Sequence, residues 1–296
     1  MTPSASDEIP APYGTGSREV PSSLSPGRPA ARVRIHHLAA AKDRSEHFAM
    51  LTAYDQYTAQ IFDEAGIDVL LVGDSAANNV FGHETSIPVT VDELIPLCRA
   101  VARSAHRALV VADLPFGSYE ASPAQGVETG VRFLKEGLAH AVKMEGGAYY
   151  AETVRAMVQA GIPVIAHIGF TPQSEHALGG YRVQGRGDDV ARLIEDAKAL
   201  EAAGAFCVLM EMVPAAAAAS VDAAVRVPTI GIGAGSSTTG QVLVWQDMAG
   251  LRGGEGTRIS KFVKQYADLR GQLLDAARRY RDDVRSGAFP GREHSF

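Results

Sequence analysis

Short, almost continuously apolar runs recur along this chain from residue 47 onward, and most are separated by stretches with apolar residues at every third or fourth position. Such short runs are typical of strands in a parallel sheet that is covered on both faces. The spacing in the intervening stretches, for example residues 188–205, is typical of amphipathic helices. The pattern predicts eight strands, at residues 47–54, 68–74, 108–115, 141–145, 163–170, 205–212, 228–235 and 241–248.

The alternation of strands and helices predicts the fold class. Repeated βα units build parallel sheets, and eight of them fit a closed TIM (β/α)8 barrel, an α/β fold of about 250 residues. The strand count disfavours an open doubly wound sheet. The glycine-rich residues 231–240 (GIGAGSSTTG) lack the G-x-G-x-x-G spacing of a dinucleotide-binding turn and precede a strand-like run instead of a helix. We interpret them as a loop after the seventh strand that approaches an anionic ligand.

The two ends of the chain differ from this pattern. Residues 1–31 are rich in Pro, Ser and Gly and have almost no large apolar side chains. They predict a disordered tail, because too little apolar surface is available to offset the entropy of ordering. Residues 32–296 continue without a linker and predict one barrel domain. Near the other end, residues 257–287 predict a long amphipathic helix that closes the barrel and serves a subunit interface.

Composition and charge exclude several classes of protein. Of the 296 residues, 46% are hydrophobic, and the net charge of −6 comes without a Lys/Arg cluster that would indicate nucleic-acid binding. No apolar run approaches the ~18 residues that cross a membrane, and the first residues lack a signal-peptide pattern, so we expect a cytoplasmic protein. Two cysteines, Cys98 and Cys207, build neither a disulfide framework nor a complete zinc site. We expect both thiols to be reduced and buried.

Polar side chains stand where five of the predicted strands end. They are Asp74 and Ser75 on the second strand, Asp113 on the third, Lys143 and Glu145 on the fourth, His167 on the fifth and Glu211 on the sixth. Because active sites of TIM barrels lie at the carboxyl ends of the strands, we expect these residues at one rim. Four carboxylates brought together raise one another's pKa unless a cation lies among them. Oxygen ligands with incomplete protein coordination favour Mg²⁺ over Zn²⁺ or Ca²⁺.

Each of these residues also has a purely structural interpretation. An Asp at a strand end often caps the next helix or holds a turn. Asp74, Asp113 and Glu145 lie on three successive strands, which favours a shared site, since independent caps need not coincide. Lys143 precedes Glu145 by two residues and therefore faces the same side, where it pairs with a carboxylate or binds an anionic substrate. His167 fits a satisfied core histidine as well as a substrate-binding residue.

Longer blocks of sequence carry a resemblance to a known family. They are MLTAYD (50–55), LLVGDSAANNV (70–80), VVADLPFGSYE (110–120), AVKMEGG (141–147), PVIAHIGFTPQS (163–174), LGGYRVQGR (178–186), VLMEMVP (208–214), GIGAG (231–235) and GQVLVWQDM (240–248). In these blocks the chain resembles the ketopantoate hydroxymethyltransferases, from about Val33 to its EHSF end and without large gaps. The FGHETSIPVTVDELI and EHSF stretches are most similar to actinobacterial members of that family.

The resemblance implies a reaction and roles for the rim residues. It implies transfer of a hydroxymethyl group from methylenetetrahydrofolate to 3-methyl-2-oxobutanoate, which gives 2-dehydropantoate in pantothenate (vitamin B5) biosynthesis. It also implies a Mg²⁺ cofactor and a homo-oligomer, a decamer in the family. Matched motif by motif, the metal-binding residues are Asp74, Asp113 and Glu145, the last directly or through water, the substrate-binding residues are Asp74, Ser75, Asp113, Lys143 and His167, and the catalytic base is Glu211.

These parts fit one mechanism. Mg²⁺ chelated by the oxo acid stabilises an enolate, which forms when Glu211 removes the C3 proton and which attacks the methylene carbon. We expect the loop over residues 171–187 to act as a lid that excludes water. Two departures from the family pattern are Thr239, where an Asp is common, and Glu175, where an apolar residue is usual. They affect what we expect of folate binding or of the rim, and leave the reaction class unchanged.

Three alternatives remain open at this point. The nearest is a metal-dependent carbon–carbon lyase or mutase of the phosphoenolpyruvate mutase and isocitrate lyase kind, although no cysteine-bearing lid motif is found near the site. In the second, Lys143 forms a Schiff base in a metal-free aldolase, which the neighbouring carboxylates disfavour because they keep Lys143 protonated. The third is a non-catalytic barrel used for binding, which the intact set of rim residues disfavours.

Overall fold

The computed structural model describes residues 31–187, 189–254, 256 and 258–296. Its eight strands are parallel and hydrogen-bonded in sequence order, and the sheet closes because β1 pairs with β8 as well as with β2. The predicted TIM-barrel fold is therefore confirmed. The strands are β1 (Phe48–Thr52), β2 (Val69–Val72), β3 (Leu109–Asp113), β4 (Ala141–Glu145), β5 (Val164–Gly169), β6 (Cys207–Glu211), β7 (Thr229–Ile232) and β8 (Gly240–Leu243).

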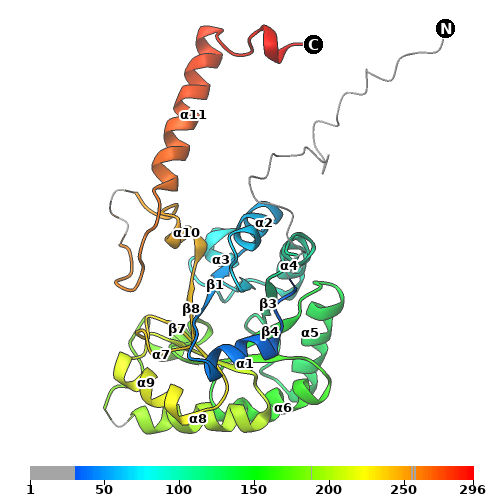
Figure 1. Cartoon of the computed structure of the whole chain (residues 1–296), viewed down its shortest axis with the longest axis vertical. Coiled ribbons are helices and arrows are strands. Elements are labelled where there is room, and N and C mark those ends of the chain that lie inside the picture. Colours follow the sequence, from blue (N-terminus) through cyan, green and yellow to red (C-terminus); the bar gives the residue numbers. More distant parts are fainter. Residues whose placement is uncertain (1–30, 188, 255, 257) are drawn as a thin grey trace, which may run out of the picture. The chain divides into compact units, whose positions relative to one another are not determined.

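Helices surround the strands, as Figure 1 shows for α4, α5, α6, α8 and α9. The α-helices are α1 (Ile35–Asp43), α2 (Gln56–Glu64), α3 (Ala76–Asn79), α4 (Val91–Ser104), α5 (Pro123–Lys135), α6 (Ala151–Gln159), α7 (Glu175–Leu178), α8 (Asp189–Ala203), α9 (Ala215–Ala224), α10 (Trp245–Met248) and α11 (Leu269–Ser286). Three short 3₁₀ helices are η1 (Ala148–Tyr150), η2 (Pro172–Ser174) and η3 (Arg292–His294). Within the described residues, no helix is both long and apolar enough to cross a membrane.

Local signals start several of the helices around the barrel. Thr90 and Glu93 form a capping box at α4, in which the Thr90 hydroxyl accepts from the Glu93 N–H and the Glu93 carboxylate accepts from the Thr90 N–H. Ser122 caps α5 and is followed by Pro123, which suits the first turn because it lacks an N–H. Asp55 caps α2 by accepting from the N–H groups of residues 57 and 58. These caps fix where each helix leaves the rim of the barrel.

The alternation of side chains along each strand divides the apolar residues between two cores. Outward-facing residues such as Leu70, Val110 and Val142 pack with the surrounding helices. Inward-facing residues form a second core with Leu38 and Ala41 of α1. The strand residues of this inner core are Phe48, Met50, Val69, Leu71, Leu109, Val111, Ala141, Ile165, Cys207, Leu209, Ile230 and Val242.

Along each strand, the row of inward-facing side chains continues into polar residues at the carboxyl end. Side chains two apart on a strand face the same way, so the row of Val111 continues to Asp113 and that of Leu209 to Glu211. The interior of the barrel is therefore apolar over most of its length and becomes charged at one end. This change of side-chain type places the candidate site.

The segments around β8 differ from the prediction. Residues 241–248 were predicted to form one strand, but the strand ends at Leu243 and α10 follows it. Residues 233–239 connect β7 to β8 without a helix, so they return from the carboxyl end of the barrel to its amino end. None of residues 233–239 lines the cavity described below, although Ile232 at the end of β7 does, and a ligand-binding role of residues 231–240 stays a prediction.

The ends of the chain and the cysteines bear on other predictions. The tail predicted over residues 1–31 lies, except for Ala31, outside the described residues. The prediction that a helix over 257–287 closes the barrel is wrong: α11 begins only at Leu269, and none of its residues is buried. A role of α11 in a subunit interface stays a prediction. Cys98 in α4 and Cys207 in β6 are free and buried, as predicted.

Candidate active site

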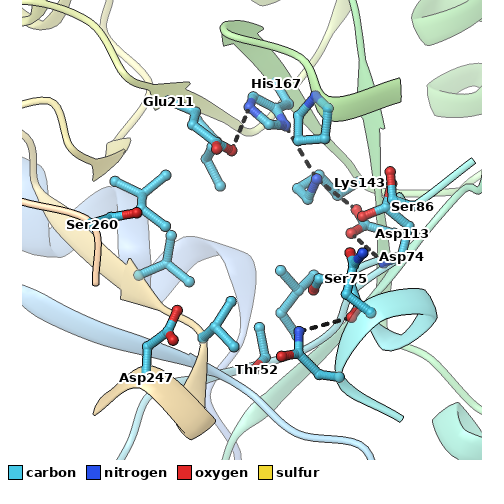
Figure 2. A pocket seen from close by; sticks show the side chains of 18 of the residues that line it. Thr52, Asp74, Ser75, Ser86, Asp113, Lys143, His167, Glu211, Asp247 and Ser260 are labelled. Carbon is cyan, nitrogen blue, oxygen red and sulfur yellow. Dashed lines mark hydrogen bonds and ion pairs between the residues drawn. The ribbon is translucent and has the colours of Figure 1, made fainter. Parts of the chain in front are cut away.

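A cavity of about 410 Å³ opens at the carboxyl ends of the strands, and it contains all seven residues that the sequence singled out. Figure 2 shows the side chains on two sides of this space. On one side lies what we call the acidic wall, which consists of Asp74 in the turn after β2, Asp113 on β3, and Lys143 and Glu145 on β4. On the other side lies what we call the opposite wall, which consists of Asp247, Arg252, Ser260 and Phe262.

Lys143 lies at the centre of the acidic wall. Its ammonium group is 2.8 Å from Oδ1 of Asp113 and 3.2 Å from Nδ1 of His167. Burial by itself lowers the pKa of Lys143, but the charges of Asp113, Glu145 and Asp74 outweigh that effect and raise the pKa above its ordinary value. Lys143 is therefore a buried cation that offsets part of the negative charge around it.

Asp74 and Asp113 are brought together by the backbone at the end of β2. The N–H of Asp74 donates to Oδ2 of Asp113 at 3.0 Å, which joins the ends of two neighbouring strands. Gly73 makes this approach possible, since a Cβ at that position would lie 2.8 Å from Oγ of Ser75 and 3.2 Å from Oδ2 of Asp113. A larger residue at position 73 would force these groups apart.

Gln173 ties the acidic wall together, and sequence analysis missed it. Its amide nitrogen Nε2 donates to Oδ2 of Asp74 and to the carbonyl of Leu114, both at 3.0 Å. Its backbone N–H donates to Oε2 of Glu145 at 3.0 Å, and its Oε1 accepts from the Tyr119 hydroxyl at 2.7 Å. Gln173 belongs to η2 in the segment after β5, so one buried residue from that segment orients two carboxylates on other strands.

His167 lies between the acidic wall and Glu211. The charged Lys143 donates to Nδ1, so the proton of a neutral imidazole lies on Nε2, which is 3.5 Å from Oε2 of Glu211. Burial, together with the Lys143 charge, holds the pKa of His167 well below its ordinary value. His167 is thus a neutral group that presents an N–H to Glu211, and the sequence alone had left a core role equally open.

Burial shifts the carboxyl groups of the cavity towards the protonated form. It raises the pKa of Asp113 to about 7 and that of Glu145 to about 7, in both cases against the lowering effect of Lys143. Burial and the Glu145 charge raise the pKa of Asp74 and bring that of Glu211 to about 8. A cation among these groups would reverse the trend, because it favours their ionised forms.

Ser75 completes the side of the cavity next to β1 and β2. Its hydroxyl is 2.8 Å from the Tyr54 hydroxyl, and its carbonyl accepts from Nδ2 of Asn79 at 2.8 Å. Burial raises the pKa of Tyr54 to about 12, so the phenol stays protonated and can donate to Ser75. The Ser75 hydroxyl is then free to donate its own proton to an acceptor in the cavity.

The acidic wall fits a hard cation with few protein ligands. Among the described residues, no three His, Cys, Asp or Glu side chains stand as a ready-made ligand set. Mg²⁺ is commonly held by only one or two carboxylates, with substrate and water completing its shell. Within the part of the chain that the structure describes, Oδ1 of Asp113 pairs with Lys143, and the buried Oε1 of Glu145 accepts no hydrogen bond and lies 3.4 Å from Nδ1 of His167. The Glu145 oxygen without a donor and the remaining lone pair of the Asp113 oxygen are available to such a cation.

The opposite wall and the rim contain residues that the sequence analysis did not single out. Asp247 and Arg252 follow β8, and Ser260 and Phe262 come from the segment before α11. Tyr181 of the predicted lid segment also lines the cavity.

Thr239, one of the two departures from the family pattern, lies outside the cavity. It is next to the start of β8 at the amino end of the barrel, where it pairs with Thr229. The departure at Thr239 therefore concerns the amino end of the barrel and not the rim, and its effect on folate binding stays a prediction.

Known proteins match this chain over almost its whole length. A model of the ketopantoate hydroxymethyltransferase family matches residues 32–292. The chain is 76% identical to a 3-methyl-2-oxobutanoate hydroxymethyltransferase of Arthrobacter sp. (strain FB24), over 99% of this chain and 97% of the relative. It is 75% identical to the protein with the same name from Paenarthrobacter aurescens (strain TC1), over 98% and 96% of the two chains.

Solved structures with much lower sequence identity share the fold. A phosphonopyruvate hydrolase, in complex with oxalate and Mg²⁺, has a TM-score of 0.57 at 16% identity and covers 88% of this chain and 92% of its own. A 2,3-dimethylmalate lyase of the phosphoenolpyruvate mutase/isocitrate lyase superfamily has a TM-score of 0.54 at 18% identity, with 88% and 91% coverage. At such identities the similarity extends to the barrel fold alone.

Proposed function

The chain belongs to the ketopantoate hydroxymethyltransferase family, and on that premise we propose how its cavity carries out the family's reaction. The chain is an enzyme that transfers a hydroxymethyl group to 3-methyl-2-oxobutanoate, the reaction that gives 2-dehydropantoate for pantothenate synthesis. The one-carbon donor in our proposal is methylenetetrahydrofolate. One water is consumed as well, because the methylene group arrives without the hydroxyl oxygen.

The observation that carries the proposal is the position of Glu211 beside the acidic wall. The acidic wall offers Asp74 and Asp113 as ligands of a divalent cation, with Glu145 bound directly or through water. We take the cation to be Mg²⁺, which when bound supplies a Lewis acid for the 2-oxo group of the substrate. Lys143 and Ser75 bind the substrate carboxylate, and His167 lies next to it.

Glu211 then acts as the general base. It removes the proton at C3 of the oxo acid, and the carbanion formed there attacks the one-carbon unit, which the consumed water has released from the folate as formaldehyde by breaking its two C–N bonds. The proton then passes to the new alkoxide, which becomes the hydroxyl group of the product. Burial raises the pKa of Glu211 to about 8, which makes its carboxylate a stronger base than an exposed glutamate. The N–H of the neutral His167, 3.5 Å from Glu211, helps to hold the ionised form in place.

Further parts of the proposal concern the lid, the assembly, the location in the cell and the kind of substrate. Residues 171–187 cover the cavity during the reaction and exclude water, since Pro172 and Tyr181 of this segment line it. The enzyme assembles into a homo-oligomer, as a decamer in our proposal, and works in the cytoplasm. It uses small-molecule substrates.

All three alternatives lose support. The lyase or mutase alternative shares only its fold with this chain, at 16–18% identity, whereas the transferase relatives are up to 76% identical. The aldolase alternative needs an unprotonated Lys143, but the surrounding carboxylates raise the pKa of Lys143. A non-catalytic barrel has no use for the buried charges of the acidic wall, which are costly to bury.

The test is an assay of the purified full chain with 3-methyl-2-oxobutanoate and methylenetetrahydrofolate. We expect 2-dehydropantoate and tetrahydrofolate to form in equal amounts, and we expect a chelator to stop the reaction until Mg²⁺ is added back. Without folate, the enzyme with Mg²⁺ exchanges the C3 proton of the oxo acid with deuterated water. Product formation that persists after complete metal removal would overturn the metal assignment, and borohydride trapping of Lys143 on the substrate would restore the aldolase alternative.

A further inference from the structure

The opposite wall presents a carboxylate that no step proposed so far uses. Asp247, at the end of α10, lines the cavity, and its side chain is 17% exposed. Neither of its carboxylate oxygens accepts a hydrogen bond from the part of the chain that the structure describes, and the nearest cation, Nη1 of Arg252, is 3.8 Å away. Figure 2 shows Asp247 across the cavity from Lys143 and Asp113.

A half-buried carboxylate in this state can accept hydrogen bonds from a ligand in the cavity. Leaving a desolvated acceptor without a partner costs free energy, and a hydrogen bond to a charged group recovers more than one to a neutral group. The side chain of Arg252 is 57% exposed and lies beyond ideal hydrogen-bond distance, so its pairing with Asp247 is screened by water. Asp247 therefore has acceptor capacity to spare on the cavity side.

The oxo acid is not a suitable partner for Asp247. Its carboxylate is negatively charged and would be repelled by a second carboxylate, whereas Lys143 attracts it on the acidic wall. It also has only a handful of non-hydrogen atoms, while a cavity of about 410 Å³ lies in the range that takes drug-sized ligands. Space for a second, larger ligand remains next to the opposite wall.

The one-carbon carrier has the matching chemistry. The edge of a reduced pterin ring carries an amino group beside a ring N–H, and two adjacent donors of this kind fit the two oxygens of one carboxylate. The faces of the ring are apolar, and Ile232, Val244 and Phe262 supply apolar side chains to the lining of the same cavity. Phe262 packs against Gly233, where a Cβ would approach its ring to 2.9 Å, so the aromatic side chain is held at the wall.

We propose that Asp247 is the pterin-recognition residue of this enzyme, and that the folate ring lies between Asp247 and Phe262 with its one-carbon unit directed at the acidic wall. This inference rests on the function proposed above, since it assigns the position of the second substrate in the same cavity. It makes Asp247 a binding residue for the folate alone. The oxo acid, its deprotonation and the cation belong to the other wall.

The test compares two substrates in one variant. In Asp247→Asn the size of the side chain is kept, but its amide nitrogen faces the pterin donors and the negative charge is lost. We expect the KM for methylenetetrahydrofolate to rise about 10- to 100-fold, with a parallel loss of tetrahydrofolate binding in calorimetry. The KM for the oxo acid and the folate-independent C3 exchange stay at the values of the unmodified enzyme, which a merely misfolded variant would not achieve.

The matched control is Glu84→Gln, which neutralises an exposed carboxylate that lines the cavity from the segment between α3 and α4. We expect its KM for folate to be unchanged. An unchanged folate KM in Asp247→Asn, or an equal rise with both substrates, would overturn the assignment of Asp247. Failure of the proposed function looks different, because the unmodified enzyme would then neither exchange the C3 proton nor form product.

Discussion

The two walls of the cavity differ in how their polar groups are satisfied. On the acidic wall, Asp113 pairs with Lys143 and with the N–H of Asp74, and Gln173 connects Asp74 to Glu145. On the opposite wall, the side chain of Asp247 has one loose partner among the described residues, Arg252 at 3.8 Å. The acidic wall is thus fixed by the fold before any ligand binds, while the opposite wall leaves its hydrogen bonds to a ligand.

This difference indicates which part of the reaction each wall serves. Groups that stabilise developing charge must be held in place in advance, because reorganisation during the reaction would cost part of the stabilisation. Groups that recognise a second substrate need only complementary donors and acceptors and room for the molecule. The acidic wall therefore suits the oxo acid and its deprotonation, and the opposite wall suits the carrier.

The largest effect is expected from breaking the acidic wall at Asp113. Asp113→Asn keeps the size of the side chain but removes the charge that pairs with Lys143 and that we assign to the cation. We expect the turnover to fall by about a thousandfold or more, with loss of Mg²⁺ binding in calorimetry. Circular dichroism should show an intact barrel. Turnover close to that of the unmodified enzyme would show that the cation lies elsewhere.

Removal of the base should give the next largest effect. In Glu211→Gln we expect the C3 proton exchange of the oxo acid to slow about 10²- to 10⁴-fold, because the amide cannot accept the proton. Mg²⁺ binding persists, since Glu211 lies outside the acidic wall. The measurement is deuterium incorporation followed by NMR. If exchange in the variant matched that of the unmodified enzyme, another group would have to be the base.

A smaller effect is expected from loosening the acidic wall through Gln173. Gln173→Leu removes the donor to Asp74 and the acceptor for Tyr119, and leaves every charged residue in place. We expect Mg²⁺ affinity to fall about 10- to 100-fold, with much of the turnover recovered at saturating Mg²⁺. Gln184→Leu in the same segment, a partly exposed position, serves as the control. Equal Mg²⁺ affinity in the two variants would argue against a positioning role for Gln173.

The smallest effect, counted over a single pH unit, is expected from titration of the base. Because the pKa of Glu211 is raised to about 8, the base is protonated and inactive below that value, and deprotonation activates it as the pH rises. We expect the C3 exchange rate to rise up to tenfold per pH unit and to level at or below pH 8, since a bound cation lowers this pKa. The measurement is the exchange rate from about pH 5.5 to 9 at saturating Mg²⁺. A rate that falls over this range would contradict the assignment.

Much of the site could be predicted from the sequence because strand order brings the relevant residues together. In a parallel barrel the carboxyl ends of all strands lie on one rim, so Asp113, Lys143 and Glu211 meet although they are far apart in the chain. Alternation along β4 also determines that Lys143 and Glu145 face the same side. These inferences needed only the period of each element and its direction.

The sequence could not predict which residues outside the strands would join the site. Gln173 has no neighbour in the sequence that indicates its bonds to Asp74 and Glu145, and Asp247 lies in a run that was predicted to continue as a strand. The helix after residue 257 was also placed against the barrel, but the apolar side chains of α11, such as Leu273 and Tyr280, are exposed. An amphipathic pattern shows that one face of a helix is apolar, but it does not show which part of the molecule, or which partner, packs against that face.

The sequence by itself thus determined the barrel, the rim and the charged residues of the acidic wall, since these follow from local periodicity and the fixed direction of parallel strands. The tertiary structure alone decided that Gln173 orients two carboxylates, that His167 faces Glu211, and that Asp247 stands across the cavity. The physical reason is that a hydrogen bond between distant segments depends on where each loop places its side chain. No local spacing in the chain encodes that position.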